Sequence, residues 1–113
     1  MSDLPDWCTG EDFCPVTATA NLLGKKYHPV ILHRLLKEEK GFNELKRSIP
    51  GVTAKVLSRS LKDLQENRLV NREVLSESPK KVEYSLTEEG RSMEKVLDAM
   101  REWGEQNFTE KQG

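Results

Sequence analysis

The sequence is poor in cysteine and holds no long apolar run. Its two cysteines among 113 residues are too few for the disulfide framework of a small secreted domain. The longest run of bulky apolar residues is Val30-Ile31-Leu32, whereas a membrane-spanning helix needs ~20 residues. Residues 1–13 are acidic and lack the basic start and apolar stretch of a secretory signal. These absences predict a cytoplasmic protein with no membrane partner.

The chain also lacks an excess of either charge, since 18 Lys and Arg oppose 19 Asp and Glu. Near-neutrality by itself argues against nucleic acid as a partner, because domains that bind it tend to be basic. The distribution along the chain indicates the opposite. Residues 25–81 hold fourteen bases and seven acids, a charge of +7, while residues 1–24 and 82–113 each carry −4. A basic middle between acidic ends favours a polyanionic partner, with uneven scatter of surface charge as the alternative.

The length predicts one domain, and no repeat or long linker divides it. We expect an N-terminal arm over 1–13, a folded domain over 14–107 and a C-terminal tail over 108–113. Apolar spacing, together with turn signals such as Pro50-Gly51, predicts four helices in the first two-thirds of the chain. Their ranges are 15–24, 28–39, 42–49 and 54–67, and Thr53 is the expected N-cap of the last.

The period of the pattern changes after the fourth helix. Residues 69–75 have strand character, residues 82–86 alternate apolar and polar side chains, and a polar loop over 76–81 joins them. Thr87 then caps a long helix with one continuous apolar stripe. The stripe consists of Met93, Val96, Leu97, Met100 and Trp103. This order of elements is that of a winged helix-turn-helix, a mainly α fold with a small β-hairpin (α+β).

The predicted fourth helix has two chemically different faces. Leu57, Leu61 and Leu64 form a narrow apolar seam, and the opposite side carries three cations and a hydroxyl. These outward residues are Lys55, Arg59, Lys62 and Ser58. Such a face suits the major groove of double-stranded DNA, and the helix start at Thr53 offers free N–H groups to a phosphate. The alternative is a charged face that only keeps the helix in solution.

Lys80 and Lys81 lie at the predicted hairpin tip. A lysine pair in a turn is commonly just solvated, but beside the fourth helix it is placed to contact the backbone or minor groove of adjoining DNA. One domain with a handful of phosphate contacts binds DNA weakly and non-specifically. Specific binding therefore implies two copies of the chain on a two-fold operator.

Aromatic residues make up only 6% of the chain, yet they gather at its two ends. Trp7 and Phe13 precede the first helix, and Trp103 and Phe108 lie near the last residues. Because these side chains have little core of their own to enter, we expect them to pack across the axis of a homodimer, together with Met100. The alternative is packing of the two ends within one chain.

The two cysteines are placed differently. Cys14 directly precedes Pro15 and takes the cap position of the first helix, where the helix dipole stabilises a thiolate. Cys14 is thus a candidate sensor of an oxidant, and Cys8 is a candidate resolving partner within or between chains. A small cysteine without a role is the alternative for each.

Catalysis and metal binding find no support in the residues. His28 and His33 are five apart, do not share a helix face and pair with no cysteine at ligand spacing. No Gly-rich phosphate loop, nucleophile motif or close carboxylate pair is present. The sequence therefore predicts no enzyme, no metal and no cofactor.

A set of short motifs follows one order along residues 14–104. The runs are Cys14-Pro15-Val16, Gly24-Lys25-Lys26-Tyr27, Phe42-Asn43-Glu44-Leu45, Ile49-Pro50-Gly51-Val52-Thr53-Ala54-Lys55-Val56-Leu57, Pro79, Val82-Glu83-Tyr84-Ser85-Leu86-Thr87, Gly90 and Trp103-Gly104. The ordered set resembles the HxlR-type family of winged-helix transcription regulators, relatives of the MarR group. The resemblance implies a homodimeric DNA-binding regulator whose terminal helices form the dimer and whose fourth helix enters the major groove.

The resemblance also implies roles for single residues. It places Lys55, Ser58 and Arg59 on the recognition helix, and it places Lys80 and Lys81 on the wing. Some family members carry, at the position of Cys14, a thiol that responds to oxidants or electrophiles. A small-molecule effector bound at the dimer interface is compatible with this reading. The rival function is a winged-helix module for protein–protein assembly without specific DNA binding.

Three positions depart from the family pattern. Gly24-Lys25-Lys26-Tyr27 stands where the family usually has Gly-Gly-Lys-Trp, a change that we expect to affect only packing. Gly41 replaces a frequent arginine, which removes one expected phosphate contact. Lys80 replaces the second wing proline, which favours a more mobile and more cationic wing.

Overall fold

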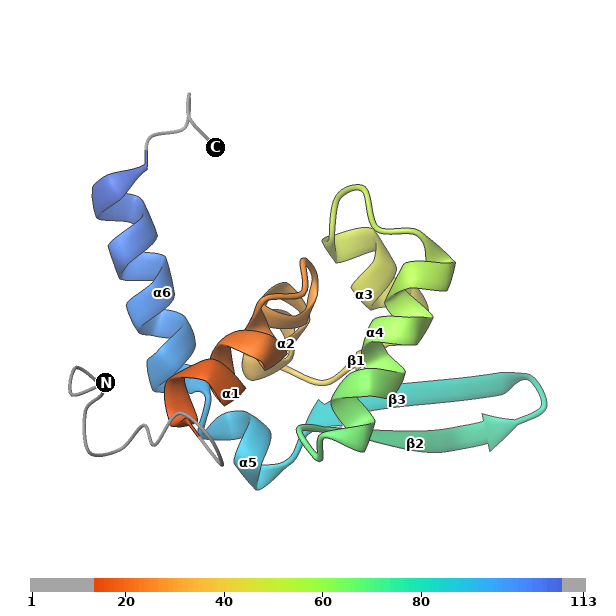
Figure 1. Ribbon diagram of the computed structural model, residues 1–113. Helices are drawn as coiled ribbons and strands as arrows, with labels where there is room; N and C mark the ends of the chain where they lie inside the picture. The colour runs from red at the N-terminus through yellow and green to blue at the C-terminus, as the bar shows by residue number, and fades with distance from the viewer. Residues whose placement is uncertain (1–13, 109–113) are drawn as a thin grey trace.

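The computed structural model describes residues 14–108, in which helices pack against one end of a three-stranded antiparallel sheet whose hairpin projects beyond them (Figure 1). The elements in chain order are α1 (Pro15–Leu23), α2 (His28–Lys37), β1 (Lys40–Gly41), α3 (Phe42–Ser48), α4 (Ala54–Glu66), β2 (Val70–Glu77), β3 (Lys80–Leu86), α5 (Glu88–Arg91) and α6 (Glu94–Asn107). The strands lie in the order β1-β3-β2. This arrangement confirms the predicted winged helix-turn-helix, with α3 and α4 as the helix pair and β2–β3 as the wing.

The ends of the helices follow from local chemistry. Pro15 occupies the first turn of α1, where its missing N–H costs no hydrogen bond. The hydroxyl oxygen of Thr53 accepts the backbone N–H of Val56 at 3.1 Å and so caps α4, as predicted. At the start of α3, the carboxylate of Glu44 accepts the N–H of Gly41 at 2.8 Å.

The core forms where α2 and α4 meet above the sheet. Its fully buried side chains include Ile31, Leu32 and Leu35 of α2, which pack with the leucine seam of α4. Leu69, Val70, Tyr84 and Leu86 close the core from the sheet side. α4 is therefore fixed through its apolar face, and its other face is exposed to solvent.

Two predicted boundaries differ by more than one residue in the structure. The second helix ends at Lys37 rather than residue 39, because Glu38 adopts an extended backbone and Lys40–Gly41 pair with β3 as a short strand. The predicted loop over 76–81 is mostly strand, since β2 and β3 pair up to Glu77 and Lys80 and leave only Ser78-Pro79 as the turn.

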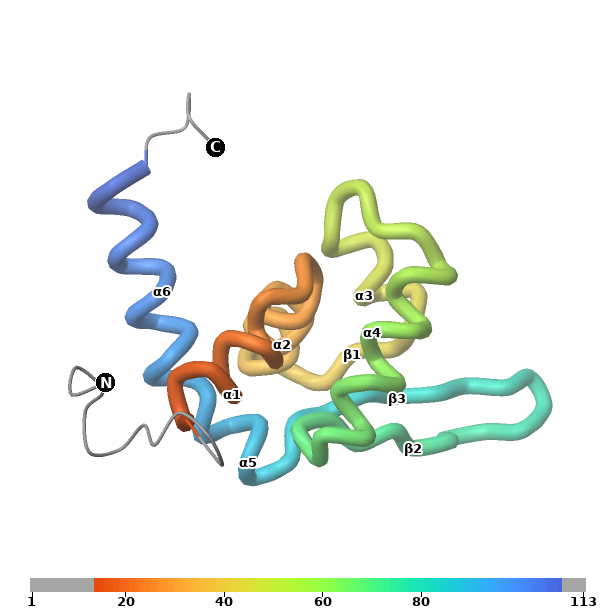
Figure 2. The backbone as a smooth tube through the Cα atoms, in the orientation of Figure 1, coloured from red at the N-terminus to blue at the C-terminus, as the bar shows by residue number. Residues whose placement is uncertain are grey.

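The long helix predicted after Thr87 is two helices. Thr87 caps α5 by accepting the N–H of Gly90, but the N–H of Met93 bonds to the carbonyl of Gly90 three residues back instead of four. This tighter turn interrupts the ladder and lets α6 leave in a new direction, away from the sheet (Figure 2). The described residues include no helix that is both long and apolar enough to cross a bilayer.

The predicted stripe on α6 is consequently divided. Leu97 is buried where α6 packs on α2, and Met93 and Val96 are half-buried beside it. Met100 and Trp103, further along the helix, remain exposed because α6 projects beyond the body of the fold (Figure 1).

Candidate nucleic-acid interface

α4, the predicted recognition helix, presents the two faces that its spacing predicts. Leu57, Leu61 and Leu64 are completely or almost completely buried. The outward residues Lys55, Ser58, Arg59 and Lys62 are all exposed. Thr53 is exposed as well, but its hydroxyl already caps the helix. One side of α4 is thus bound to the core, and the other offers three cations and a hydroxyl.

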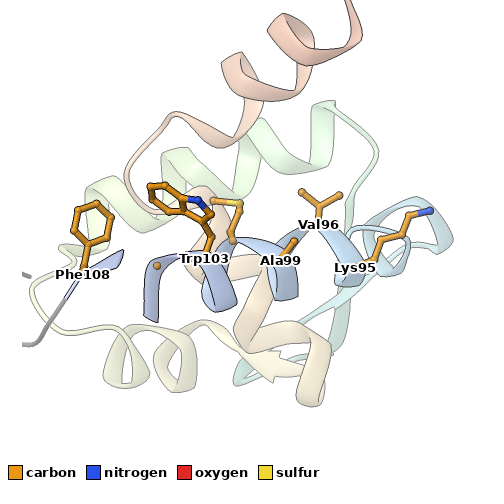
Figure 3. Close-up of a pocket in the computed structure, with 7 residues that line it drawn as sticks. Lys95, Val96, Ala99, Trp103 and Phe108 are labelled. Atoms are coloured by element: carbon orange, nitrogen blue, oxygen red, sulfur yellow. The ribbon is translucent and has the colours of Figure 1, made fainter. Parts of the chain in front are cut away.

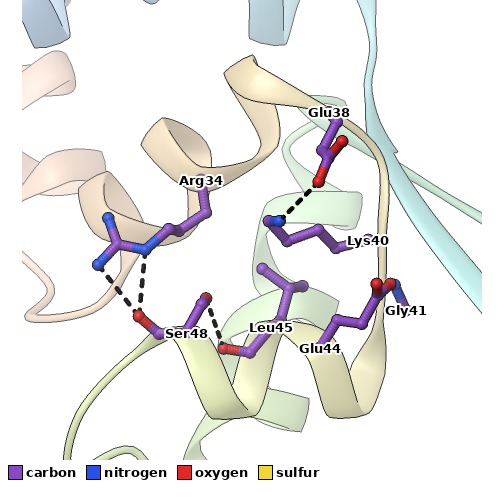
Figure 4. Close-up of polar contacts among 7 residues, drawn as sticks. All are labelled: Arg34, Glu38, Lys40, Gly41, Glu44, Leu45 and Ser48. Carbon is purple, nitrogen blue, oxygen red and sulfur yellow. Dashed lines mark hydrogen bonds and ion pairs between the residues drawn. The ribbon is translucent and has the colours of Figure 1, made fainter.

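The turn before α4 is held by a contact from α2. The guanidinium of Arg34 donates two hydrogen bonds, from Nε at 3.2 Å and Nη2 at 3.1 Å, to the carbonyl of Ser48 (Figure 4). That carbonyl lies at the end of α3, where the helix itself supplies no partner. The chain then turns through Gly51, whose φ of +82° suits glycine. Arg34 therefore fixes the C-terminal end of α3, after which the chain turns into α4.

The wing places its lysines directly after its tight turn. Lys80 pairs with Glu77 and Lys81 with Ser76 across the hairpin, and both lysine side chains are exposed. In Figure 1 the hairpin extends well past α4. An irregularity in the pairing lies between Val74 and Ser76. The wing thus carries its two cations at its far end, away from the core.

His28, which has no metal-ligand spacing in the sequence, makes a buried contact with α4. His28, at the start of α2, is only 2% exposed, and its Nε2 lies 2.7 Å from Oδ2 of Asp63 on α4. This hydrogen bond holds the pKa of Asp63 below its ordinary value, and Lys25, with Nζ 3.6 Å from the same oxygen, lowers it further. The pattern carried no signal for this contact, because the two partners are far apart in sequence.

An exposed apolar face covers α1 and α6. A groove along α6 is lined by Val96, Met100, Trp103 and Phe108 (Figure 3), and a second hollow joins Val16 and Leu23 of α1 to the same Val96 and Met100. The rings of Trp103 and Phe108 meet edge to face with centroids 5.8 Å apart, yet 59% and 57% of these residues stay exposed. The other two predicted interface residues, Trp7 and Phe13, lie outside the described residues.

Cys14 is the N-cap residue of α1, half-buried and disulfide-bonded. Cys8 lies outside the described residues, so its predicted role stays a prediction. Among residues 14–108 no group of His, Cys, Asp and Glu side chains is arranged to hold a metal ion.

Comparison with known proteins agrees with this architecture. The HxlR-like helix-turn-helix family model matches residues 22–112. The chain is 37% identical over 107 residues to the HTH-type transcriptional regulator YybR of Bacillus subtilis, covering 95% of this chain and 86% of that protein.

Two solved structures of winged-helix regulators are similar over most of their length. The redox regulator HypR in its oxidised form has a TM-score of 0.78 at 40% identity, covering 85% of this chain and 99% of that one. The quinone-bound YodB from B. subtilis has a TM-score of 0.72 at 36% identity, covering 83% of this chain and 99% of that one. The family match, the sequence identity and the shared fold agree, and the chain belongs to the HxlR-like helix-turn-helix family.

Proposed function

We propose that this DNA-binding regulator of transcription acts as a homodimer on a two-fold operator and that oxidants or electrophiles control it through Cys14. Each subunit would place residues 53–62 in the major groove and residues 78–81 against the neighbouring backbone. The observation that carries the proposal is the division of α4. Its leucine seam is fully buried, while Lys55, Ser58, Arg59 and Lys62 are all exposed.

The outward face of α4 has the chemistry that reads a duplex. Lys and Arg donate hydrogen bonds to the O6 and N7 acceptors of guanine, and they also pair with phosphates. Glu66 shares this face but sits at the last residue of α4, where a helix inserted by its N-terminal half has left the groove. The wing lysines add contacts that carry no sequence information but orient the domain on the DNA.

The apolar face of α1 and α6 favours a second copy of this chain as its cover. Trp103, Phe108, Met100 and Val16 are each more than two-fifths exposed and border continuous grooves. Such an apolar face is suited to a two-fold contact, because in a symmetric dimer the same patch of each subunit covers that of the other. Two recognition helices related by that axis then meet two half-sites.

Control by oxidants rests on the position of Cys14. In the reduced protein, a thiol at the start of a helix is stabilised as the reactive thiolate, and the disulfide that Cys14 forms in this structure constrains the chain that enters α1. Because α1 lines the apolar face with α6, a change at Cys14 is placed to alter the dimer. HypR is described as a redox regulator and YodB has been solved with a bound quinone, which supports oxidants and electrophiles as effectors here.

Selection of bound sequences from a random DNA pool, with reduced protein and with diamide-treated protein, tests the proposal. We expect one enriched two-fold sequence whose recovery changes on diamide treatment. The variant Cys14→Ser should bind the same sequence and ignore diamide. Enrichment of no sequence contradicts specific DNA binding, and equal recovery with and without diamide contradicts control through Cys14.

Sedimentation equilibrium at micromolar concentration tests the proposed dimer, which a monomeric mass would exclude.

A further inference from the structure

A second group of cations lies beside α4, on the turn between α1 and α2. Together with one flank of α4, this turn encloses a hollow of about 430 Å³. Its lining includes Lys25 and Lys26 from the turn and Arg59, Ser60 and Asp63 from α4. Arg59 belongs both to the outward face of α4 and to this hollow, so the two surfaces are continuous.

The charges around the hollow do not cancel. Asp63 is the single acid in its lining, and it is already engaged by His28 at 2.7 Å and by Lys25 at 3.6 Å. Within residues 14–108 no carboxylate forms an ion pair with Lys26 or Arg59. The ammonium of Lys26 lies 5.3 Å from the centre of the Tyr27 ring, a contact that holds the side chain beside the hollow without neutralising it. The rim is therefore positive.

His28 fixes the position of the hollow relative to α4. This residue lines the hollow and is 2% exposed, and its Nδ1 is buried without a hydrogen-bond partner among the described residues. The Nε2 contact of the same ring with Asp63 ties the turn to α4, so the lysines keep a fixed position relative to the recognition helix.

We infer that the hollow receives a backbone phosphate of the DNA strand next to the recognition helix, held by Lys26 with Lys25 and Arg59 at the rim. The inference rests on the proposed function and adds a contact to it. In Figure 1, α4 lies between the turn and the tip of the wing, so cations flank the helix on both sides. The two lysines lie on the turn beside α4 and not on the helix itself. When α4 enters the major groove, groups at its flank face the sugar-phosphate backbone, so a phosphate and not a base edge is their expected partner.

Replacement of single phosphates in the selected operator by neutral methylphosphonates tests this contact. The variant is Lys26→Ala, with Lys37→Ala as control, because Lys37 is an exposed lysine at the opposite end of α2 from His28. Wild-type protein should lose affinity when the contacted phosphate is neutralised. Lys26→Ala should be insensitive at that position alone, and its slope of log affinity against log salt should fall by about 1. Lys37→Ala should match the wild type at every position.

Three outcomes separate the possibilities. If Lys26→Ala keeps the wild-type sensitivity at every phosphate and the wild-type salt slope, the phosphate contact is wrong, and Lys55→Ala, an exposed residue of α4 outside the hollow, still shows whether α4 reads the operator. If the wild-type protein binds no DNA, the proposed function falls and this contact falls with it. Binding of inorganic phosphate to the DNA-free protein that requires Lys26, with no position-specific effect in the operator, would overturn DNA as the source of the phosphate.

Discussion

The imidazole of His28 lies 2.7 Å, from Nε2 to Oδ2, from the carboxylate of Asp63, and this hydrogen bond joins the first turn of α2 to the recognition helix. Together with the ion pair from Nζ of Lys25 to the same oxygen at 3.6 Å, it ties the cationic turn at Lys25 and Lys26 to α4. An ionised carboxylate only accepts hydrogen bonds, so Nε2 carries the proton that is shared with Asp63.

Replacement of Asp63 by Asn should therefore destabilise the fold in a pH-dependent way. The folded-state pKa of Asp63 is lowered, so its ionised form stabilises the fold. This contribution is complete above the ordinary pKa of aspartate, about 3.9, and is lost as the pH falls through the lower folded value. Urea unfolding should show wild type more stable than Asp63→Asn at pH 6 and the difference shrinking below about pH 4. The exposed Asp98 supplies the control Asp98→Asn, and a difference that stays constant down to pH 2 would contradict the assignment.

Gly90 should tolerate no side chain. A Cβ at this position would overlap the backbone oxygen of Leu69, where α5 packs against the start of the sheet. Backbone atoms do not yield as a flexible side chain does, so Gly90→Ala should lower stability by about 2–3 kcal/mol. Gly104, within α6, has nothing within 4 Å of an added Cβ, and Gly104→Ala should raise stability by about 0.5–1 kcal/mol through helix propensity. Thermal unfolding of the two variants at one protein concentration compares them, and equal melting temperatures would refute the clash.

The sequence predicts those parts of the fold that carry a periodic burial signal. The seam of Leu57, Leu61 and Leu64 follows from helical spacing alone, and so does the exposed face opposite it. The length of the wing does not follow, because β2 is exposed along nearly its whole length and shows no alternation. The sequence gives no signal for the break before α6 either, since a single tight turn at Met93 leaves the apolar spacing intact.

The candidate site likewise has a part that the sequence predicts and a part that it does not. Cations on one helix can be placed relative to each other from the sequence, because the helix fixes their angles. The hollow beside α4 depends on how α2 crosses α4, and no local pattern states that Lys25 and Asp63 approach within 3.6 Å. The expectation that the change at Lys25 affects only packing missed this ion pair with the recognition helix.

The capping role of Thr53 can be measured without DNA. Its hydroxyl accepts the N–H of Val56 at 3.1 Å, and removal of such a cap costs about 1 kcal/mol. Thr53→Ala should therefore lower the free energy of unfolding by that amount without DNA present, and Thr53→Ser should restore it because serine caps equally well. Chemical denaturation gives the comparison. Unchanged stability of Thr53→Ala would show that the cap contributes nothing.

Arg59 and Lys80 should differ in what their loss does to binding. Arg59→Ala should weaken binding to the selected operator by about 1–3 kcal/mol if the guanidinium contacts a base edge, and it should relax the preference at that base. Lys80→Ala, on the exposed wing, should weaken binding to all sequences alike and flatten the salt dependence. Fluorescence anisotropy on operator and scrambled DNA at several salt concentrations measures both. An Arg59→Ala variant with unchanged affinity and preference would remove that residue from the recognition surface.

Trp103 should be decisive for the dimer and dispensable for the fold. The residue is 59% exposed and meets Phe108 edge to face, so its truncation leaves the core of the subunit intact. At the centre of an interface, removal of a tryptophan costs about 2 kcal/mol or more, and Trp103→Ala should therefore raise the dimer dissociation constant at least roughly 30-fold. The exposed Glu102 on the same helix provides the control Glu102→Ala, which should leave that constant unchanged. Sedimentation equilibrium measures the constant, and circular dichroism confirms that the helix content is kept. A dissociation constant of Trp103→Ala equal to that of the wild type would place the dimer contact elsewhere, because the apolar face of α6 would then bury nothing on association.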